Sequence, residues 1–108
     1  MEKKHEEALR KNWVFLMDNL IIDGVLDSMM SKETFTSGMV EEVSVKQTRK
    51  DKATQFLFTL IRRGPHAFDL FLEALRENSQ DFIADQLVDT LNGKNWVDIV
   101  FNSFNIFL

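Results

Sequence analysis

The sequence predicts an all-α fold, an antiparallel bundle of six short helices. Apolar residues recur three and four positions apart in successive segments, which is the helical period. Helix start and stop signals separate those segments, and the connections are brief. The one strand-like fragment, Val43–Val45, has no second strand to pair with. With 108 residues, 44% hydrophobic and 28% charged, the chain suits one soluble globular domain with a modest core.

The first predicted helix covers residues 1–21 as a single element. Its apolar stripe follows the helical period and is widened by three further residues: Leu9, Trp13, Leu16 and Leu20, with Val14, Met17 and Ile21.

A second helix is predicted to start at Asp23, which is a suitable N-cap residue. Its apolar side consists of Ile22, Val25, Leu26, Met29 and Met30. We interpret the methionine pair as core filler rather than as a binding surface. A short third helix begins near Thr36 or Ser37 and buries Met39, Val40 and Val43.

The fourth helix opens at Thr48–Asp51, which matches a capping box. It has the most regular apolar pattern in the chain, formed by Ala53, Phe56, Leu57, Leu60 and Ile61. Arg62 and Arg63 are placed in its last turn, where cations suit the helix dipole.

Gly64 and Pro65 predict a tight joint between the fourth and fifth helices. Gly64 can adopt the left-handed conformation that ends a helix, and Pro65 suits the first turn of the next. The fifth helix buries Phe68, Phe71, Leu72 and Leu75. The sixth starts near Asp81, ends at Asn92–Gly93 and buries Ile83, Ala84, Leu87, Val88 and Leu91.

Residues 94–108 form a strongly apolar extension that allows three interpretations. We favour an extra helix packed on the bundle through Trp96, Ile99, Val100 and Phe104. The alternatives are a partner-binding or aggregation-prone tail, and a divergent end from a truncated or alternatively spliced product. The extension is too short and too interrupted by polar residues to span a bilayer.

Charge changes sign from segment to segment. Residues 23–45 carry five acidic residues against one lysine, for a net charge of −4. Residues 46–63 carry six basic residues against one aspartate (+5), and residues 64–91 six acidic residues against one arginine (−5). A single charged run is usually just a solvated helix face. Segregation over successive helices instead favours a dipolar surface, whose unlike patches can meet head to tail.

No constellation for catalysis, metal or cofactor binding is present. The chain has no cysteine, which excludes disulfides and a cysteine protease within it. His5 and His66 have no metal-ligand companion at helical spacing, and we expect His66 to be a surface residue. The pI near 5.1 argues against nucleic acid as the main partner. The N-terminus lacks a signal-peptide core, so we expect a cytoplasmic or nuclear setting.

Several stretches resemble the caspase recruitment domain (CARD) of initiator caspase prodomains, of the caspase-2 type with caspase-9-like features. They are the Arg63-Gly64-Pro65 joint with the fifth helix, and residues 5–12 (HEEALRKN), 30–42 (MSKETFTSGMVEE), 48–53 (TRKDKA) and 87–93 (LVDTLNG). The resemblance implies a CARD over residues 1–93 with the six-helix death fold. It also implies a first helix that is bent or broken near its middle.

The resemblance further implies a non-catalytic module that recruits an initiator caspase to an adaptor or scaffold in apoptosis signalling. Its partner would be another CARD protein or a second copy of itself. The basic patch would include Arg10, Lys11, Arg49, Lys50 and Lys52, and the acidic patch Asp23, Asp27, Glu41 and Glu42.

Trp13 and Thr54 stand where caspase-9-type prodomains carry arginines. That departure disfavours an apoptosome scaffold as the partner and favours a caspase-2-like adaptor. Two alternative functions remain open, both resting on the apolar extension. One is a CARD-only decoy that caps an assembly, and the other is a helical protein with a membrane- or partner-binding tail.

Overall fold

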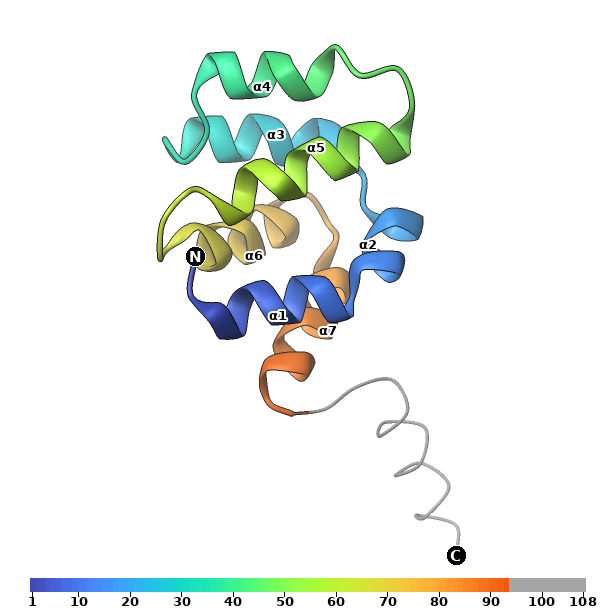
Figure 1. Ribbon diagram of the computed structural model, residues 1–108, viewed down its shortest axis with the longest axis vertical. Coiled ribbons are helices and arrows are strands. Elements are labelled where there is room, and N and C mark those ends of the chain that lie inside the picture. Colours follow the sequence, from blue (N-terminus) through green and yellow to red (C-terminus); the bar gives the residue numbers. More distant parts are fainter. Residues whose placement is uncertain (94–108) are drawn as a thin grey trace, which may run out of the picture.

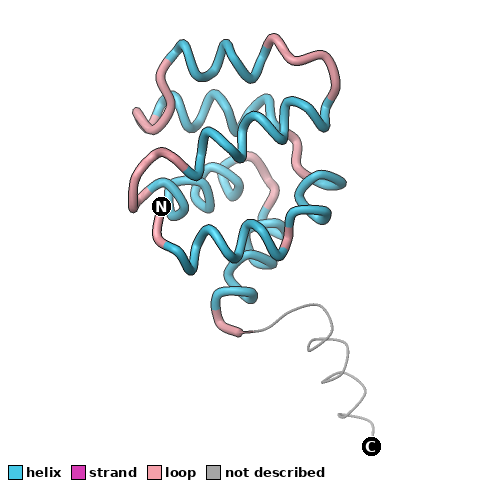
Figure 2. Tube along the Cα trace, in the orientation of Figure 1, coloured by secondary structure: helices cyan, strands magenta, loops and turns pink. Residues whose placement is uncertain are grey.

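The computed structural model describes residues 1–93 as a bundle of helices joined by short loops (Figures 1 and 2). The helices are α1 (Lys3–Lys11), α2 (Trp13–Asn19), α3 (Ile22–Ser31), α4 (Ser37–Ser44), α5 (Arg49–Ile61), α6 (Ala67–Glu77) and α7 (Asp81–Leu91). Within these residues no strand occurs, so the all-α prediction is confirmed. The interpretations of residues 94–108 lie outside the described part of the chain.

The core lies where α5 and α6 meet the other helices. Three phenylalanine rings pack in tilted pairs at its centre: ring centroids are 5.1 Å apart for Phe35–Phe56 and 5.4 Å for Phe56–Phe71. All three side chains are fully buried. Around them, α3 packs on α4, α5 and α6, while α1 packs on α7 (Figure 1). The stripes predicted for the fourth to sixth helices supply nearly half of this core, and α1 to α4 with the loop residue Phe35 supply most of the rest.

The predicted first helix is two helices, α1 and α2, which separate at Asn12. The carboxamide of the buried Asn12 donates to Thr90 Oγ1 (2.8 Å) and accepts from Gln86 Nε2 (3.2 Å), both on α7. These bonds hold the turn where the helix breaks. The single-helix prediction is therefore wrong, and the break implied by the resemblance is confirmed. Val14 and Ile21 were predicted to widen the stripe but are 73% and 62% exposed, so that part of the prediction is wrong.

Two helix starts differ from the prediction. The structure begins α3 at Ile22 with Ile21 at the N-cap position, so Asp23 lies inside the first turn and does not cap it. Pro65 lies in a turn before α6, which begins at Ala67 after His66. The other joints match: the hydroxyls of Thr36 and Thr48 accept from the backbone N–H of Met39 and Asp51.

The stop signals also behave as predicted. Gly64 has φ +93° and Gly93 has φ +80°, the left-handed conformation that a glycine tolerates best. The prediction for Arg62 and Arg63 is wrong: Arg62 is the C-cap residue of α5 and Arg63 follows it, so both lie beyond its last turn. The Nε of Arg63 donates to the carbonyl of Thr34 (2.8 Å), which ties the joint to the loop after α3.

Met30 is 42% exposed, while its neighbour Met29 is fully buried. The core-filler interpretation is therefore right for Met29 and wrong for Met30. Residues 29 and 30 are adjacent on α3, and adjacent residues on a helix point about 100° apart.

Candidate protein interaction surface

The helices α1 and α2 run antiparallel to α5 and meet it along one seam. The N-terminal amino group donates to the carbonyl of Ile61 (3.4 Å), at the end of α5. Further along, Thr54 Oγ1 lies 3.5 Å from the sulfur of Met17. At the far end, Arg49 reaches the end of α2. Residues of α1 and α2 therefore face α5 in reverse order.

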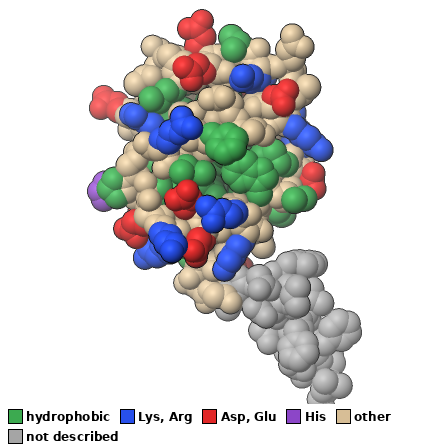
Figure 3. Space-filling model, in the orientation of Figure 1, with side chains coloured by type: hydrophobic (Ala, Val, Ile, Leu, Met, Phe, Trp, Pro, Cys, Tyr) green, Lys and Arg blue, Asp and Glu red, His purple; other side chains and the backbone are tan. Residues whose placement is uncertain are grey.

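A groove of about 330 Å³ opens along this seam, lined by Glu6, Arg10, Trp13, Phe58, Ile61 and Arg62. The rings of Trp13 and Phe58 form its apolar part, with centroids 5.5 Å apart and planes tilted by 48°. Figure 3 shows hydrophobic side chains gathered where α1, α2 and α5 meet, with both basic and acidic side chains around them. Within the groove, Arg10 and Arg62 outnumber the single carboxylate of Glu6 beside the aromatic rings.

The five residues of the predicted basic patch do not share one site. Arg10 lines the aromatic groove and forms an ion pair with Glu6 (3.8 Å) one turn before it on α1. Lys50 is exposed at the start of α5, one turn before Thr54. Lys11 instead lines a separate cavity between α1 and the end of α7, with Lys4, Thr90 and Gly93.

Arg49 holds the fold together as well as carrying charge. Its guanidinium donates to the carbonyls of Asp18 and Leu20, each at 3.2 Å, where α2 ends. Such carbonyls have no partner within their own helix, so this is a C-terminal cap supplied from another element. Lys52 lies near Arg49 in a cavity of about 190 Å³ that Ile21, Ile22 and Asp23 also line.

The predicted acidic residues are all exposed on α3 and α4, which pack side by side. Asp27, Glu41 and Glu42 form no ion pair with any residue of the described chain. Asp23 shares its cavity with Arg49 and Lys52, so it lies at the border between the acidic and the basic residues. The acidic surface is therefore centred on Asp27, Glu41 and Glu42.

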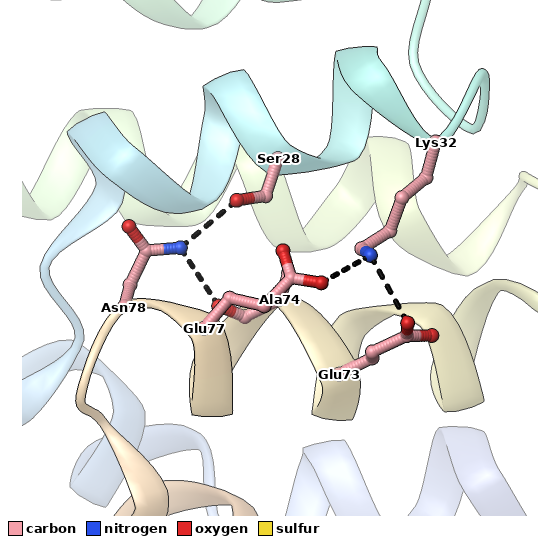
Figure 4. A network of polar contacts seen from close by, with 6 residues as sticks. All are labelled: Ser28, Lys32, Glu73, Ala74, Glu77 and Asn78. Carbon is pink, nitrogen blue, oxygen red and sulfur yellow. Dashed lines mark hydrogen bonds and ion pairs between the residues drawn. The ribbon is translucent and has the colours of Figure 1, made fainter.

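The one lysine of the acidic 23–45 segment points away from this surface. Lys32, at the end of α3, forms ion pairs with Glu77 and Glu73 of α6, the latter at 3.3 Å (Figure 4). The hydrogen bond with Glu77, and then that with Glu73, raises the pKa of Lys32 above its ordinary value of 10.5, although burial opposes this. Because Lys32 is engaged with α6, it does not neutralise the carboxylates of α3 and α4.

Sequence reasoning did not predict the exposure of three side chains on these surfaces. Phe58 lies off the buried stripe of α5, which was the available signal that it faces solvent. Met30 was assigned to the core because it follows Met29 and extends the apolar run. Trp13 was placed in the first-helix stripe, yet it is only partly buried and packs against Phe58.

The described chain offers no other chemical site. Within residues 1–93, no group of three or more His, Asp or Glu side chains is placed to hold a metal ion. His66 is exposed as expected, whereas His5 is buried and stacks on Phe68 with ring centroids 4.4 Å apart. None of the seven described helices has the length and apolar character needed to cross a bilayer.

Comparison with known proteins places this bundle in a family. The model of the caspase recruitment domain matches residues 6–90. The chain is 37% identical over 90 residues to caspase-2 of Gallus gallus and 30% identical over 89 residues to caspase-9 of Homo sapiens. These matches cover 83% and 81% of the chain, but it spans only about a fifth (21%) of the length of each relative. No caspase catalytic domain is contained in these 108 residues. The chain belongs to the caspase recruitment domain family.

Proposed function

We propose that the chain is a homotypic interaction module that brings an initiator caspase to an adaptor or scaffold carrying a related domain. There, zymogens held close together would activate one another, in apoptosis signalling. The observation that carries this proposal is the presence of two unlike charged surfaces on different helices. On α3 and α4, Asp27, Glu41 and Glu42 have no ion pair with a described residue, while Arg10 and Lys50 border the seam of α1 and α2 with α5.

Unlike surfaces favour head-to-tail contact. The basic surface of one domain attracts the acidic surface of the next, and like surfaces repel one another. Because the two surfaces differ, such a contact is heterologous and leaves a free surface at each end. Further copies can then add, which raises the local concentration of whatever each domain carries.

The geometry narrows the residues that would carry the contact. Arg49 is committed to the end of α2, Lys11 faces α7, and Asp23 borders the cations. We therefore assign the basic side to Arg10 and Lys50, and the acidic side to Asp27, Glu41 and Glu42. Lys52 is left out, because it lines the same separate cavity as Asp23 and Arg49.

The preferred partner is an adaptor of the kind that a caspase-2-type prodomain binds. Trp13 and Thr54, at the positions of arginines in caspase-9-type prodomains, lie side by side with Phe58 and Met17 on the seam. A partner that requires cations at these two positions would lose both ion pairs here.

The test is to replace the aligned segment of chicken caspase-2 with this chain and to measure self-cleavage of the fused zymogen. The double reversal Arg10→Glu/Lys50→Glu is expected to reduce self-cleavage at least tenfold, because it turns attraction into repulsion. The reversal Asp27→Lys/Glu42→Lys should have the same effect. Combining all four substitutions should restore part of the activity, since the surfaces become complementary again.

The control is Lys3→Glu/Lys4→Glu, which makes the same change in net charge on the exposed start of α1. It should leave self-cleavage unchanged. All variants are first compared with the parent by thermal unfolding, so that loss of folding is recognised. Unchanged self-cleavage in both surface reversals would contradict the proposal.

A further inference from the structure

An aromatic pair is exposed at the centre of the basic surface. Phe58 is 50% exposed although α5 buries four other apolar side chains completely, and Trp13 beside it is only partly buried. A single exposed phenylalanine needs no explanation. Here, however, two aromatic rings and Ile61 line one groove, which gives a partner side chain a shaped apolar surface to enter.

The charges around this groove restrict what can enter it. Arg10 and Arg62 line the same groove, and Lys50 lies two turns before Phe58 on α5. Glu6 is the one carboxylate lining the groove among the described residues, and it pairs with Arg10. A fitting partner therefore presents an apolar side chain with carboxylates next to it.

The acidic surface of this same chain has that composition. Met30 is exposed on α3, and Asp27 lies three residues before it, on the same side of the helix. Glu41 and Glu42 are exposed on the neighbouring α4. A methionine side chain is unbranched and polarizable, so it fits irregular grooves and makes favourable contacts with aromatic rings.

We propose that a second copy of this chain docks with its Met30 between Trp13 and Phe58. Asp27, Glu41 and Glu42 of that copy then face Arg10, Arg62 and Lys50. The inference rests on the proposed function and adds an apolar anchor to its charged contact. Burying Met30 and Phe58 supplies affinity, while the surrounding charges set orientation and partner choice.

The first test measures self-association of the full chain by sedimentation velocity over a concentration series at low salt. Phe58→Ala is expected to weaken self-association at least tenfold, as is typical of a central aromatic contact. The matched control is Phe82→Ala on α7: Phe82 is 54% exposed and packs edge-on against Phe15, 6.2 Å between ring centroids. The control should associate as the parent does, and a monomeric parent at all concentrations would overturn the inference.

The second test uses the unlike character of the two surfaces. A Phe58→Ala copy keeps its Met30, and a Met30→Ala copy keeps its groove. Each variant alone should remain largely monomeric, whereas an equimolar mixture should form a dimer in which one copy uses its groove and the other its Met30. A mixture as monomeric as the separate variants would overturn the inference.

The two proposals can fail separately. If Phe58→Ala and Met30→Ala associate as the parent does while Arg10→Glu/Lys50→Glu does not, the contact is ionic and the apolar anchor is wrong. If the charge reversal also leaves self-association unchanged, the charged surfaces of the proposed function are wrong too.

Discussion

The guanidinium of Arg49, at the start of α5, donates to the carbonyl of Leu20, the C-cap residue of α2, at 3.2 Å. A second bond of the same length reaches the carbonyl of Asp18. The two carbonyls are thereby satisfied by a cation, which also suits the negative end of the helix dipole. A residue predicted to bind a partner is thus part of the framework that holds α2 against α5.

Replacing Arg49 is therefore expected to lower stability. Arg49→Met should reduce the free energy of unfolding by about 1 kcal/mol, because two carbonyls lose a charged donor at a solvent-exposed site. Arg49→Lys should recover only part of that loss, since a single ammonium does not reproduce the planar guanidinium fork. Urea unfolding followed by circular dichroism measures the change.

The control for Arg49 is Lys50→Met, which removes the same charge from the adjacent exposed position. Its stability should stay within about 0.5 kcal/mol of the parent. Equal stability of the Arg49→Met and Lys50→Met variants would show that the two hydrogen bonds contribute nothing.

The buried Asn12 makes a second prediction possible. Asn12→Ala should lower the free energy of unfolding by about 1–3 kcal/mol, because it leaves Gln86 and Thr90 without their partner in a partly buried site. Asn19→Ala is the matched control: both asparagines donate to the carbonyl four residues before them, at 2.8 Å. Of the two asparagines, only Asn12 has side-chain hydrogen bonds to α7. The Asn19 variant should therefore lose less stability, and thermal unfolding can measure the difference.

Asn12 also shows which part of the fold could not be predicted from local sequence patterns. Helical periodicity correctly predicted α5, α6 and α7, because each buries one stripe against the core and the pattern is local. The break at Asn12 depends on Gln86 and Thr90, 74 and 78 positions away, and no local pattern encodes such a contact. Only the resemblance to a known family indicated it.

The sequence predicted the sign of the charge on each helix, but not which charged side chains are engaged in contacts within the fold. Segment charges correctly located acidic side chains on α3 and α4 and cations on α5. Whether a charge is free depends on tertiary contacts: Lys32 turns to α6, and Arg49 caps α2. Predicting that Met30 and Phe58 are exposed would have required knowing which side of each helix remains uncovered after packing.

The ion pairs of Lys32 predict a loss of stability at alkaline pH. Since the folded state raises the pKa of Lys32 above 10.5, the native chain binds more protons than the unfolded chain as pH passes that value. The stabilisation is complete below the unfolded pKa and is lost as pH rises through the folded one. Lys32→Met should remove this part of the pH dependence, measured as unfolding midpoints between pH 8 and about 11.

The chain suits this measurement because it contains no tyrosine or cysteine that would titrate in the same range. Lys46→Met serves as the control, since Lys46 is exposed and has no ion pair with a described residue. It should keep the alkaline loss of the parent. A Lys32→Met profile that parallels the parent would contradict the prediction.

The last prediction concerns Gly24, where α3 closely approaches the end of α6. A Cβ atom at Gly24 would lie 2.1 Å from Oδ1 of Asn78, whose amide donates to Ser28 Oγ and to the carbonyl of Ala74 (Figure 4). Gly24→Ala should therefore displace Asn78 and cost about 1 kcal/mol net, because lost hydrogen bonds outweigh the gain in helix propensity.

A double-mutant cycle isolates this contact. In an Asn78→Ala background the clash is absent, so Gly24→Ala should become neutral or stabilising by up to about 1 kcal/mol, giving a coupling of about 1–2 kcal/mol. Gly38→Ala on α4 is the control, since the nearest atom to its Cβ is Thr36 Oγ1 at 3.8 Å, an ordinary contact. It should stabilise the parent by helix propensity alone. Equal effects of Gly24→Ala in both backgrounds would mean that Asn78 moves aside without cost, and that α3 and α6 are not held together by this contact.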